Sequence, residues 1–342
     1  MPHRSSASNH PPTVITAQRT FFKCGVMSCR AHHAALVMFD IIASHVTFSP
    51  LGARLVSVFF DGADMLAGGG NDEQLLAGDW TAGAVCGRVA GRISNARFTL
   101  DDVEHQLTPN MGEHQLHGGP SNFGNRNWDA QLTDQSVCFA MHSPDGDQGF
   151  PGAIEATATY AINGNTLSLD LEARTSKPTV INLTSHAYWN LSGGARNAFD
   201  HEMLIAGSHF LPLNDLLLPS GELRDVTGTR WDFRELRKVG ENYDNCWVLD
   251  GERGHLKHGL TLRDPVSKRR MDVWCTEKGM QMYTAWHWND SFPGRNGPLK
   301  QFAAIAIEPQ NFPDAPNHKN FPSAVLRPGE TYRHRIEWRF GL

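Results

Sequence analysis

The feature that most constrains the fold of this chain is the run of alternating side chains at residues 154–175, IEATATYAINGNTLSLDLEART. Apolar and polar residues alternate on both sides of Asn163–Gly164. Alternation with period two places the apolar side chains on one face of a strand. The Asn-Gly pair tolerates the positive φ angles of a tight hairpin turn. This segment therefore predicts an antiparallel β-hairpin with one buried face.

The same alternation recurs from about residue 45 onward. Residues 46–60 predict a strand with a kink at Pro50–Gly52, residues 97–107 predict two strands around an Asp101–Asp102 turn, and residues 333–340 predict a further strand. Helical periodicity is scarce, and 32 glycines and 19 prolines suit many strands joined by turns. The sequence therefore predicts an all-β fold, a large antiparallel β-sandwich with few helices, whose functional residues lie on loops and on one concave sheet face.

No linker and no repeat of 20–50 residues divides the chain after residue 40. Residues 41–342 are therefore predicted to form one domain. Residues 1–40 mix Ser, Pro and His without the layout of a secretion signal. We expect them to be a poorly ordered N-terminal extension.

Charge and hydropathy exclude several classes of function. The net charge of −5 and the pI near 6.4 argue against a nucleic-acid or anionic-membrane partner. No apolar run approaches the roughly 20 residues that a membrane-spanning helix needs. The six cysteines are few and scattered, which favours reduced, mostly buried thiols. We therefore expect a cytoplasmic protein.

Five segments concentrate side chains suited to chemistry, and each also has a purely structural reading. Arg92 could be a surface arginine, His186 a buried histidine that caps backbone groups, Asp244 the start of an Asx-turn, and Glu308 the partner of a surface cation. His114 and His117 are spaced like a metal pair, but the adjacent Gly118–Gly119 and the lack of a helical pattern argue against a helix-borne zinc motif, so they could be loop histidines.

Two familiar catalytic motifs are absent. The sequence has no Gly-x-Ser-x-Gly nucleophile elbow and no Gly-x-x-x-x-Gly-Lys-Ser/Thr phosphate loop. The glycine-rich GGGND at 68–72 lacks a strand-to-helix context in the sequence and is predicted to be a turn.

Taken together, several ordered motifs resemble the aldose 1-epimerase (galactose mutarotase) family. They run from GRVAGRISNARFTLD (87–101) through LHGG, LTSHAYWNLSG, LLLPSGEL, WDFR, YDNCWVLD, GMQMYTA and EPQNFPDAPNHKNFPS to LRPGETYRH. The resemblance extends from about residue 45 to the C-terminus and implies a β-supersandwich fold. It also implies interconversion of the α and β anomers of free aldoses such as galactose and glucose, without a metal or organic cofactor. A monosaccharide would then be the partner, and we expect a monomer or weak homodimer.

The resemblance also implies roles for particular residues. A pyranose opens when its C1 hydroxyl loses a proton and its ring oxygen gains one, so one base and one acid are needed at a single carbon, and they exchange roles on ring closure. The family motifs assign the general base to Glu308, the general acid to His186, a second active-site imidazole to His117, and the holding of sugar hydroxyls to Arg92 and Asp244, with Gln281 lining the pocket.

This chain departs from the family pattern in two places. Gly91 precedes Arg92 where the family usually has Asn, which removes one partner for a sugar hydroxyl. The segment AWHWNDSFPG at 285–294 is rich in tryptophan where many relatives carry a plainer loop. Of the nearby rings, Tyr188, Trp189 and Trp286 could either cover the apolar face of a sugar or belong to the core.

Three other functions remain open from the sequence. A mutarotase for hexose 6-phosphates would need further cations, for which Arg88 or Arg126 are the candidates. A non-catalytic sugar-binding module could use the same fold. A glycoside-cleaving enzyme would use paired carboxylates, whereas the main constellation here mixes His with Glu.

Overall fold

A computed structural model describes residues 15–16, 37–41, 44–133 and 135–342. Over these residues the predicted all-β architecture is confirmed. The largest sheet is antiparallel, with nine strands in the described part of the chain. Its order is β12 (Asp129–Leu132), β13 (Ser136–Ser143), β14 (Ile154–Asn163), β15 (Thr166–Thr175), β29 (Tyr332–Gly341), β25 (Arg270–Cys275), β24 (Lys257–Arg263), β19 (Glu202–Ile205) and β22 (Arg237–Lys238).

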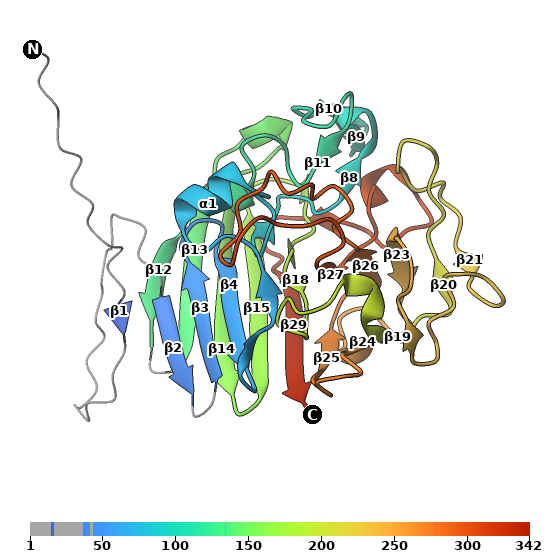
Figure 1. The fold of residues 1–342 in the computed structure, drawn as a ribbon. Coiled ribbons are helices and arrows are strands. Elements are labelled where there is room, and N and C mark those ends of the chain that lie inside the picture. The colour runs from blue at the N-terminus through green and yellow to red at the C-terminus, as the bar shows by residue number, and fades with distance from the viewer. Residues whose placement is uncertain (1–14, 17–36, 42–43, 134) are drawn as a thin grey trace, which may run out of the picture.

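Two further sheets cover one face of this large sheet and complete a sandwich (Figure 1). In the first, Phe48 packs against Phe139 and Tyr160 of the large sheet. In the second, Met280 and Ile307 share the same core cluster as Leu260 of the large sheet. The first runs β1 (Ile15–Thr16), β2 (Val37–Ile41), β3 (Ser44–Ser49), β4 (Arg54–Phe60), β5 (Ala63–Asp64); the second runs β21 (Arg224–Asp225), β20 (His209–Phe210), β23 (Asp244–Val248), β26 (Gly279–Tyr283), β27 (Ile305–Gln310), β18 (Tyr188–Trp189), β6 (Leu66–Ala67).

Short strand pairs and helical turns make up the other elements of the described residues. Within the described residues there is one α-helix, α1 (Asp72–Ala77), in agreement with the prediction of few helices. The pairs are β7 (Val85–Cys86) with β17 (Thr184–Ser185), β8 (Arg92–Ile93) with β11 (Gln115–Leu116), β9 (Arg97–Leu100) with β10 (Val103–Gln106), and β16 (Thr179–Val180) with β28 (Val325–Leu326); the 3₁₀ turns are Ser94–Ala96, Phe123–Asn125, Asp147–Gly149, Ala198–Asp200 and Ala315–Asn317.

The hairpin predicted at 154–175 is confirmed as β14 and β15. The two strands pair from Ile154 with Thr175 to Asn163 with Thr166, and buried residues alternate along β14. The strands predicted within 97–107 and at 333–340 are also present, as β9, β10 and β29.

The prediction of one kinked strand at 46–60 is wrong. The chain reverses after Pro50, and β3 and β4 pair antiparallel, with Ser49 opposite Arg54. Gly52 and Ala53 have φ angles of 74° and 45°, which a strand cannot accommodate. A Cβ on Gly52 would lie 2.5 Å from the carbonyl oxygen of Gly124, so this turn requires glycine.

The structure also bears on the predictions for the glycine run, the cysteines, the N-terminal residues and a membrane span. The glycine run 68–70 lies between β6 and α1, and the side chain of Asn71 accepts a hydrogen bond from the N–H of Gln74, so the expectation of a simple turn missed this short helix. Cys86, Cys246 and Cys275 are buried and free of disulfides. The expectation for residues 1–40 falls almost entirely outside the described residues. No helix in the described ranges is long and apolar enough to cross a membrane.

Candidate active site

A cavity of about 310 Å³ opens on the outer face of the sheet that contains β23, β26 and β27. This volume is at the lower end of the range for small-molecule sites, which suits a compact ligand. The structure brings all six residues singled out from the sequence to its walls: Arg92, His117, His186, Asp244, Gln281 and Glu308. These residues come from six separate segments of the chain.

Strand register explains how the floor of the cavity is built. Gln281 of β26 lies directly opposite Glu308 of β27, and Asp244 of β23 lies opposite Tyr283 of β26. Opposite residues in an antiparallel pair point to the same face with their Cβ atoms about 5 Å apart. Gln310 follows Glu308 by two residues and therefore shares its face. The core packs against the other face, so β26 and β27 are buried throughout.

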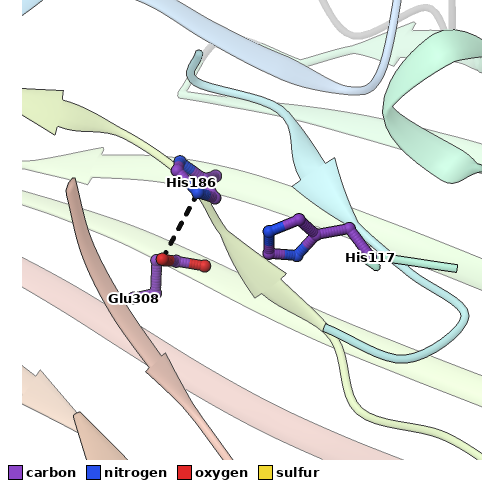
Figure 2. A group of neighbouring side chains, drawn as sticks. All are labelled: His117, His186 and Glu308. Atoms are coloured by element: carbon purple, nitrogen blue, oxygen red, sulfur yellow. Dashed lines mark ion pairs between the residues drawn. The ribbon is translucent and has the colours of Figure 1, made fainter. Parts of the chain in front are cut away.

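His186 and Glu308 form a close acid–base contact in the cavity. The Nε2 atom of His186 lies 3.3 Å from Oε1 of Glu308, and both side chains are buried (Figure 2). His186 lies between β17 and β18, where its backbone N–H donates to the carbonyl of Ala84 at 2.9 Å and its carbonyl accepts from Gly83 at 2.9 Å. These bonds hold the imidazole over the carboxylate.

The backbone beside Glu308 is equally well held. Thr184 Oγ1 donates to the carbonyl oxygen of Pro309 at 2.6 Å, and Nε2 of His334 donates to the same oxygen at 3.0 Å. Pro309 has no N–H to offer to the sheet. The two bonds to the carbonyl of Pro309 therefore add to the backbone pairing that joins strand β27 to β26 and β18.

Burial shifts the two titrating groups in opposite directions. Burial lowers the pKa of His186 to about 4, an effect that the Asp79 carboxylate opposes. Burial raises the pKa of Glu308 well above its usual value, and the charge of Asp244 adds to this rise. Each charged form alone is disfavoured in a dry site, so near neutral pH the pair holds one proton between its two members.

His117 lies on a separate segment of the chain, and its imidazole lies beside this pair (Figure 2). Its φ angle is 50°, and its backbone N–H donates to the carbonyl of Gly91 at 2.9 Å. In return the N–H of Gly91 donates to Nδ1 of His117 at 3.1 Å. Nδ1 must therefore be the acceptor, which places the ring proton on Nε2. His117 offers the cavity a hydrogen-bond donor.

The same tautomer bears on metal binding. His117, His186 and Glu308 offer ligand atoms that all lie within 4.8 Å of one another. A histidine ligand needs a free lone pair at the nitrogen facing the ion. At His117 the lone pair lies on Nδ1 and is occupied by Gly91. The donor set is therefore poorly suited to a metal ion.

Arg92, Asp244 and Gln281 form a polar ledge beside the acid–base pair. Arg92 Nη2 lies 3.2 Å from Oδ2 of Asp244, and Gln281 Nε2 donates to Oδ1 of Asp244 at 2.6 Å. Several buried polar atoms of cavity residues have no partner within the protein: Nε of Arg92, Nδ1 of His186, Oε2 of Glu308 and both amide atoms of Gln310. Unpaired buried polar groups are costly, which indicates a site that receives a polar ligand.

The structure also settles where the aromatic rings lie. Trp189 belongs to the core, with its ring 5.8 Å from that of Trp338 and 5.9 Å from that of Phe340. Tyr188 is buried and lines the cavity, and Trp286, which is 42% exposed, stands at its rim. Two of the three candidates are thus in position to contact a sugar.

The remaining candidates lie elsewhere. Arg88 is buried and donates to the carbonyls of residues 143, 144, 151 and 152. Arg126 pairs with Asp147 at 2.7 Å. Nδ1 of His114 accepts a hydrogen bond from the N–H of Asn95 at 2.9 Å, as expected for a loop histidine. None of these three lines the cavity.

The sequence reasoning missed Asp79, Tyr283, His287 and Gln310, all of which line the cavity. Gln310 could have been found from the alternation that starts at Glu308. Asp79 and His287 carry no local signal, because they meet across 208 residues of sequence.

Comparisons with known proteins agree with this geometry. The sequence profile of the aldose 1-epimerase family matches residues 39–339. Galactose mutarotase from Mus musculus is 36% identical over 270 residues, covering 76% of this chain and 79% of the relative. Aldose 1-epimerase from Escherichia coli (strain K12) is 34% identical over 276 residues, covering 75% and 79%. The crystal structure of a GalM/aldose epimerase homologue from C. elegans is 29% identical, with a TM-score of 0.85 over 90% of this chain and 99% of that one. The protein therefore belongs to the aldose 1-epimerase family.

Proposed function

We propose that this protein is an aldose 1-epimerase that interconverts the α and β anomers of free aldohexoses such as galactose and glucose. The observation that carries the proposal is the buried contact of 3.3 Å between His186 and Glu308 inside a cavity of monosaccharide scale. Family membership supports the same reaction.

In the proposed reaction, Glu308 accepts the proton of the C1 hydroxyl while His186 donates a proton to the ring oxygen. The C1–ring-oxygen bond breaks, and the C1 hydroxyl becomes the carbonyl of the open aldehyde. Rotation about C1–C2 presents the other carbonyl face, and ring closure returns each proton to its donor. The two oxygens are bonded to the same carbon, so the acid and the base must lie close together, as His186 and Glu308 do.

The ledge and the second imidazole are assigned to binding. Arg92 would donate charge-assisted hydrogen bonds to sugar oxygens, while Asp244 holds its guanidinium and Gln281 donates to Asp244. Asp244 would also accept from sugar hydroxyls, and Gln281 would accept from or donate to them. The Nε2–H of His117 would donate to a further sugar oxygen. Such fixed donors hold the sugar with C1 over the acid–base pair.

The phosphosugar reading loses its support. Arg92 is the single Arg or Lys among the described residues that line the cavity, and it is already paired with Asp244. Arg88 and Arg126 bind other groups. The carboxyl groups of Asp79, Asp244 and Glu308 would oppose a phosphate dianion. We therefore infer that the free sugar, and not its 6-phosphate, is the substrate. An anomerisation assay that compares free galactose or glucose with the 6-phosphate tests this, and turnover of the free sugar without turnover of the 6-phosphate would support it.

We further infer that residues 41–342 form the catalytic domain and that the protein acts in the cytoplasm as a monomer or weak homodimer. The three buried free thiols support a reducing location. Sedimentation analysis of the full chain tests the oligomeric state.

The catalytic roles are tested by His186→Asn and Glu308→Gln. Each removes one proton carrier, and we expect kcat to fall by about 10²–10⁴ while the circular dichroism spectrum is unchanged. Polarimetry of freshly dissolved α-D-galactose measures the rate.

The chain offers a matched control in a second His–Glu pair on the surface. Nδ1 of His142 lies 2.6 Å from Oε1 of Glu155, with both side chains exposed. We expect the variants His142→Asn and Glu155→Gln to catalyse mutarotation at the wild-type rate. Near-normal turnover by H186N or E308Q would overturn the roles, and sugar binding without turnover by the wild type would favour the non-catalytic binding module.

A further inference from the structure

The cavity contains a second buried carboxylate, Asp79, that the reaction so far does not use. Asp79 is 6% exposed and precedes β7. It accepts hydrogen bonds from the N–H of Thr81 at 2.9 Å, from the Thr81 hydroxyl and from Nε1 of Trp288 at 2.9 Å. Nε2 of His287 lies 3.2 Å from its Oδ2 atom. None of these partners is an Arg or Lys.

Asp79 is ionised in the folded protein. Burial acts to raise its pKa, but hydrogen bonds from His287 and Thr81 and the charge of the nearby histidines outweigh burial and hold the pKa well below its usual value. The buried guanidinium of Arg54 interacts with it through space, since the N–H groups of Arg54 donate to four backbone carbonyls instead. The cavity thus holds an anion without a directly bonded fixed cation.

Ring opening requires a charge distribution that burial opposes. Glu308 must be a carboxylate and His186 an imidazolium before the sugar can open, yet burial favours the arrangement in which the shared proton sits on Glu308. A negative charge beside His186 and a positive charge beside Glu308 would oppose that preference. Asp79 is the strongest of the groups that raise the pKa of His186, and Arg92 is the group that lowers the pKa of Glu308.

A chain of aromatic side chains links Asp79 to His186 along the wall of the cavity. The ring of Tyr188 lies 5.0 Å from that of His186 and 4.5 Å from that of Trp288, whose Nε1 holds Asp79. The titratable and charged groups that share the cavity with His186 are Asp79, Arg92, His117, Tyr188, Asp244, Tyr283, His287 and Glu308. Among the carboxylates, Asp244 is neutralised by Arg92 and Glu308 is the proton partner itself. Asp79 remains as the anion available to an imidazolium.

We propose that Asp79 is a positioning residue of the mutarotase reaction, whose carboxylate favours transfer of the shared proton from Glu308 to His186, where it faces the ring oxygen, while Arg92 stabilises the Glu308 carboxylate. This inference rests on the proposed function. No atom of Asp79 needs to touch the sugar. The charges of Arg92 and Asp79 together lower the cost of moving the proton from Glu308 to His186.

The proposal predicts a specific effect of removing the charge. Asp79→Asn should lower kcat about tenfold for each unit by which the pKa of His186 falls, with KM within about twofold of wild type. The pH profile of kcat should move to lower pH on both limbs, because the pair binds each of its protons less tightly without the anion. The proton on His186 should respond as well, so the ring ¹³Cε1 and ¹⁵N NMR shifts of His186, assigned by difference with H186N, should titrate at lower pH in D79N.

Two control variants disturb the frame but keep the charge. Trp288→Phe and Thr81→Val each remove one donor to Asp79 without neutralising it. Both should leave the limbs of the pH profile of kcat near their wild-type positions. Asp79→Glu keeps the charge, so its limbs should lie closer to the wild-type positions than those of D79N. Asp79→Ser serves as a second neutral variant should D79N fail to fold.

The outcomes separate this proposal from the proposed function. An unchanged His186 titration in D79N, or the same shift in W288F and T81V, would overturn the role of Asp79 whatever the activity. Wild-type protein without mutarotation would overturn the proposed function, and the NMR titration would still report on Asp79.

Discussion

At the scale of single residues, the site is defined by side chains in unfavourable states that their neighbours maintain. His117 sits at a positive φ angle, held by reciprocal hydrogen bonds with Gly91. His186 and Glu308 are ionisable groups in a site that disfavours both of their charged forms. Strain and perturbed pKa values concentrate where a protein does chemistry.

Arg92 gives a prediction at this scale. Its planar guanidinium can hold Asp244 and a sugar oxygen together, whereas a lysine ammonium is a single point charge. We expect Arg92→Lys to raise KM about tenfold, the cost of roughly one charge-assisted hydrogen bond, with a smaller change in kcat because the charge beside Glu308 is retained. Progress curves at several galactose concentrations give both constants.

The control for this variant is nearby. Arg97 is on β9, its side chain is about half exposed, and it lies 3.9 Å from Glu104. Arg97→Lys should leave both constants unchanged. An equal effect of R92K and R97K would contradict the binding role of Arg92.

At the scale of elements, strands supply the floor of the site and irregular segments supply its walls. Register places Gln281 beside Glu308, which alternation along each strand makes predictable once the strands are paired. The walls depend on backbone approaches that side chains would block. A Cβ on Gly118, which has a φ angle of 92°, would lie 2.0 Å from the carbonyl oxygen of Gly87.

Gly118 gives a prediction for the segment that carries His117. Gly118→Ala combines a left-handed conformation with a backbone clash, so it should lower the midpoint of thermal unfolding sharply and reduce mutarotation. Gly112→Ala in the same region also has a positive φ angle, 59°, but meets nothing within 4 Å. It should cost only about 1 kcal/mol of unfolding free energy. Thermal unfolding monitored by circular dichroism compares the two variants. Equal losses of stability in G118A and G112A would contradict the close approach of Gly118 to the backbone of Gly87.

At the scale of the whole molecule, a two-layer sandwich buries a large core and, with it, several neutral histidines. Burial lowers the pKa of His117, His186, His201 and His334. His334 is fully satisfied as a neutral ring, with Oγ1 of Thr276 2.9 Å from Nδ1 and the carbonyl of Pro309 3.0 Å from Nε2. The fold therefore prefers histidine without its second proton.

This preference predicts a loss of stability in mild acid. Below about pH 6.5 the histidines bind protons in the unfolded chain but stay neutral in the folded protein. The unfolding free energy therefore falls as the pH drops toward their folded pKa values. For His186, with a folded pKa of about 4, the loss between pH 6.5 and 4 amounts to roughly 3 kcal/mol. Glu308 has the opposite sign, since its raised pKa favours the folded state as the pH falls, and it offsets part of the loss.

The measurement is the midpoint of thermal unfolding at pH 7.5 and at pH 5. We expect a lower midpoint at pH 5. His334→Gln should reduce this difference because it removes one of the buried groups, whereas His255→Gln, at a largely exposed position, should not. A midpoint that stays constant or rises toward pH 5 would contradict the prediction.

The sequence by itself determined the strands that have one solvent-exposed face and the identities of six residues in the cavity. Alternation is a local property, so 154–175 could be read directly, and the ordered motifs named Glu308 and His186. The turn after Pro50 was misread because two short strands with a reversal between them show the same alternation as one kinked strand.

Only the tertiary structure decided which groups meet and in what protonation state. Asp79 and His287 pair across 208 residues, and the tautomer of His117 depends on an N–H that belongs to another segment. The shifted pKa values of His186 and Glu308 arise from burial, a property of the packed sandwich. Periodicity records which face of a strand is dry, whereas proximity and desolvation exist only after distant segments have packed together.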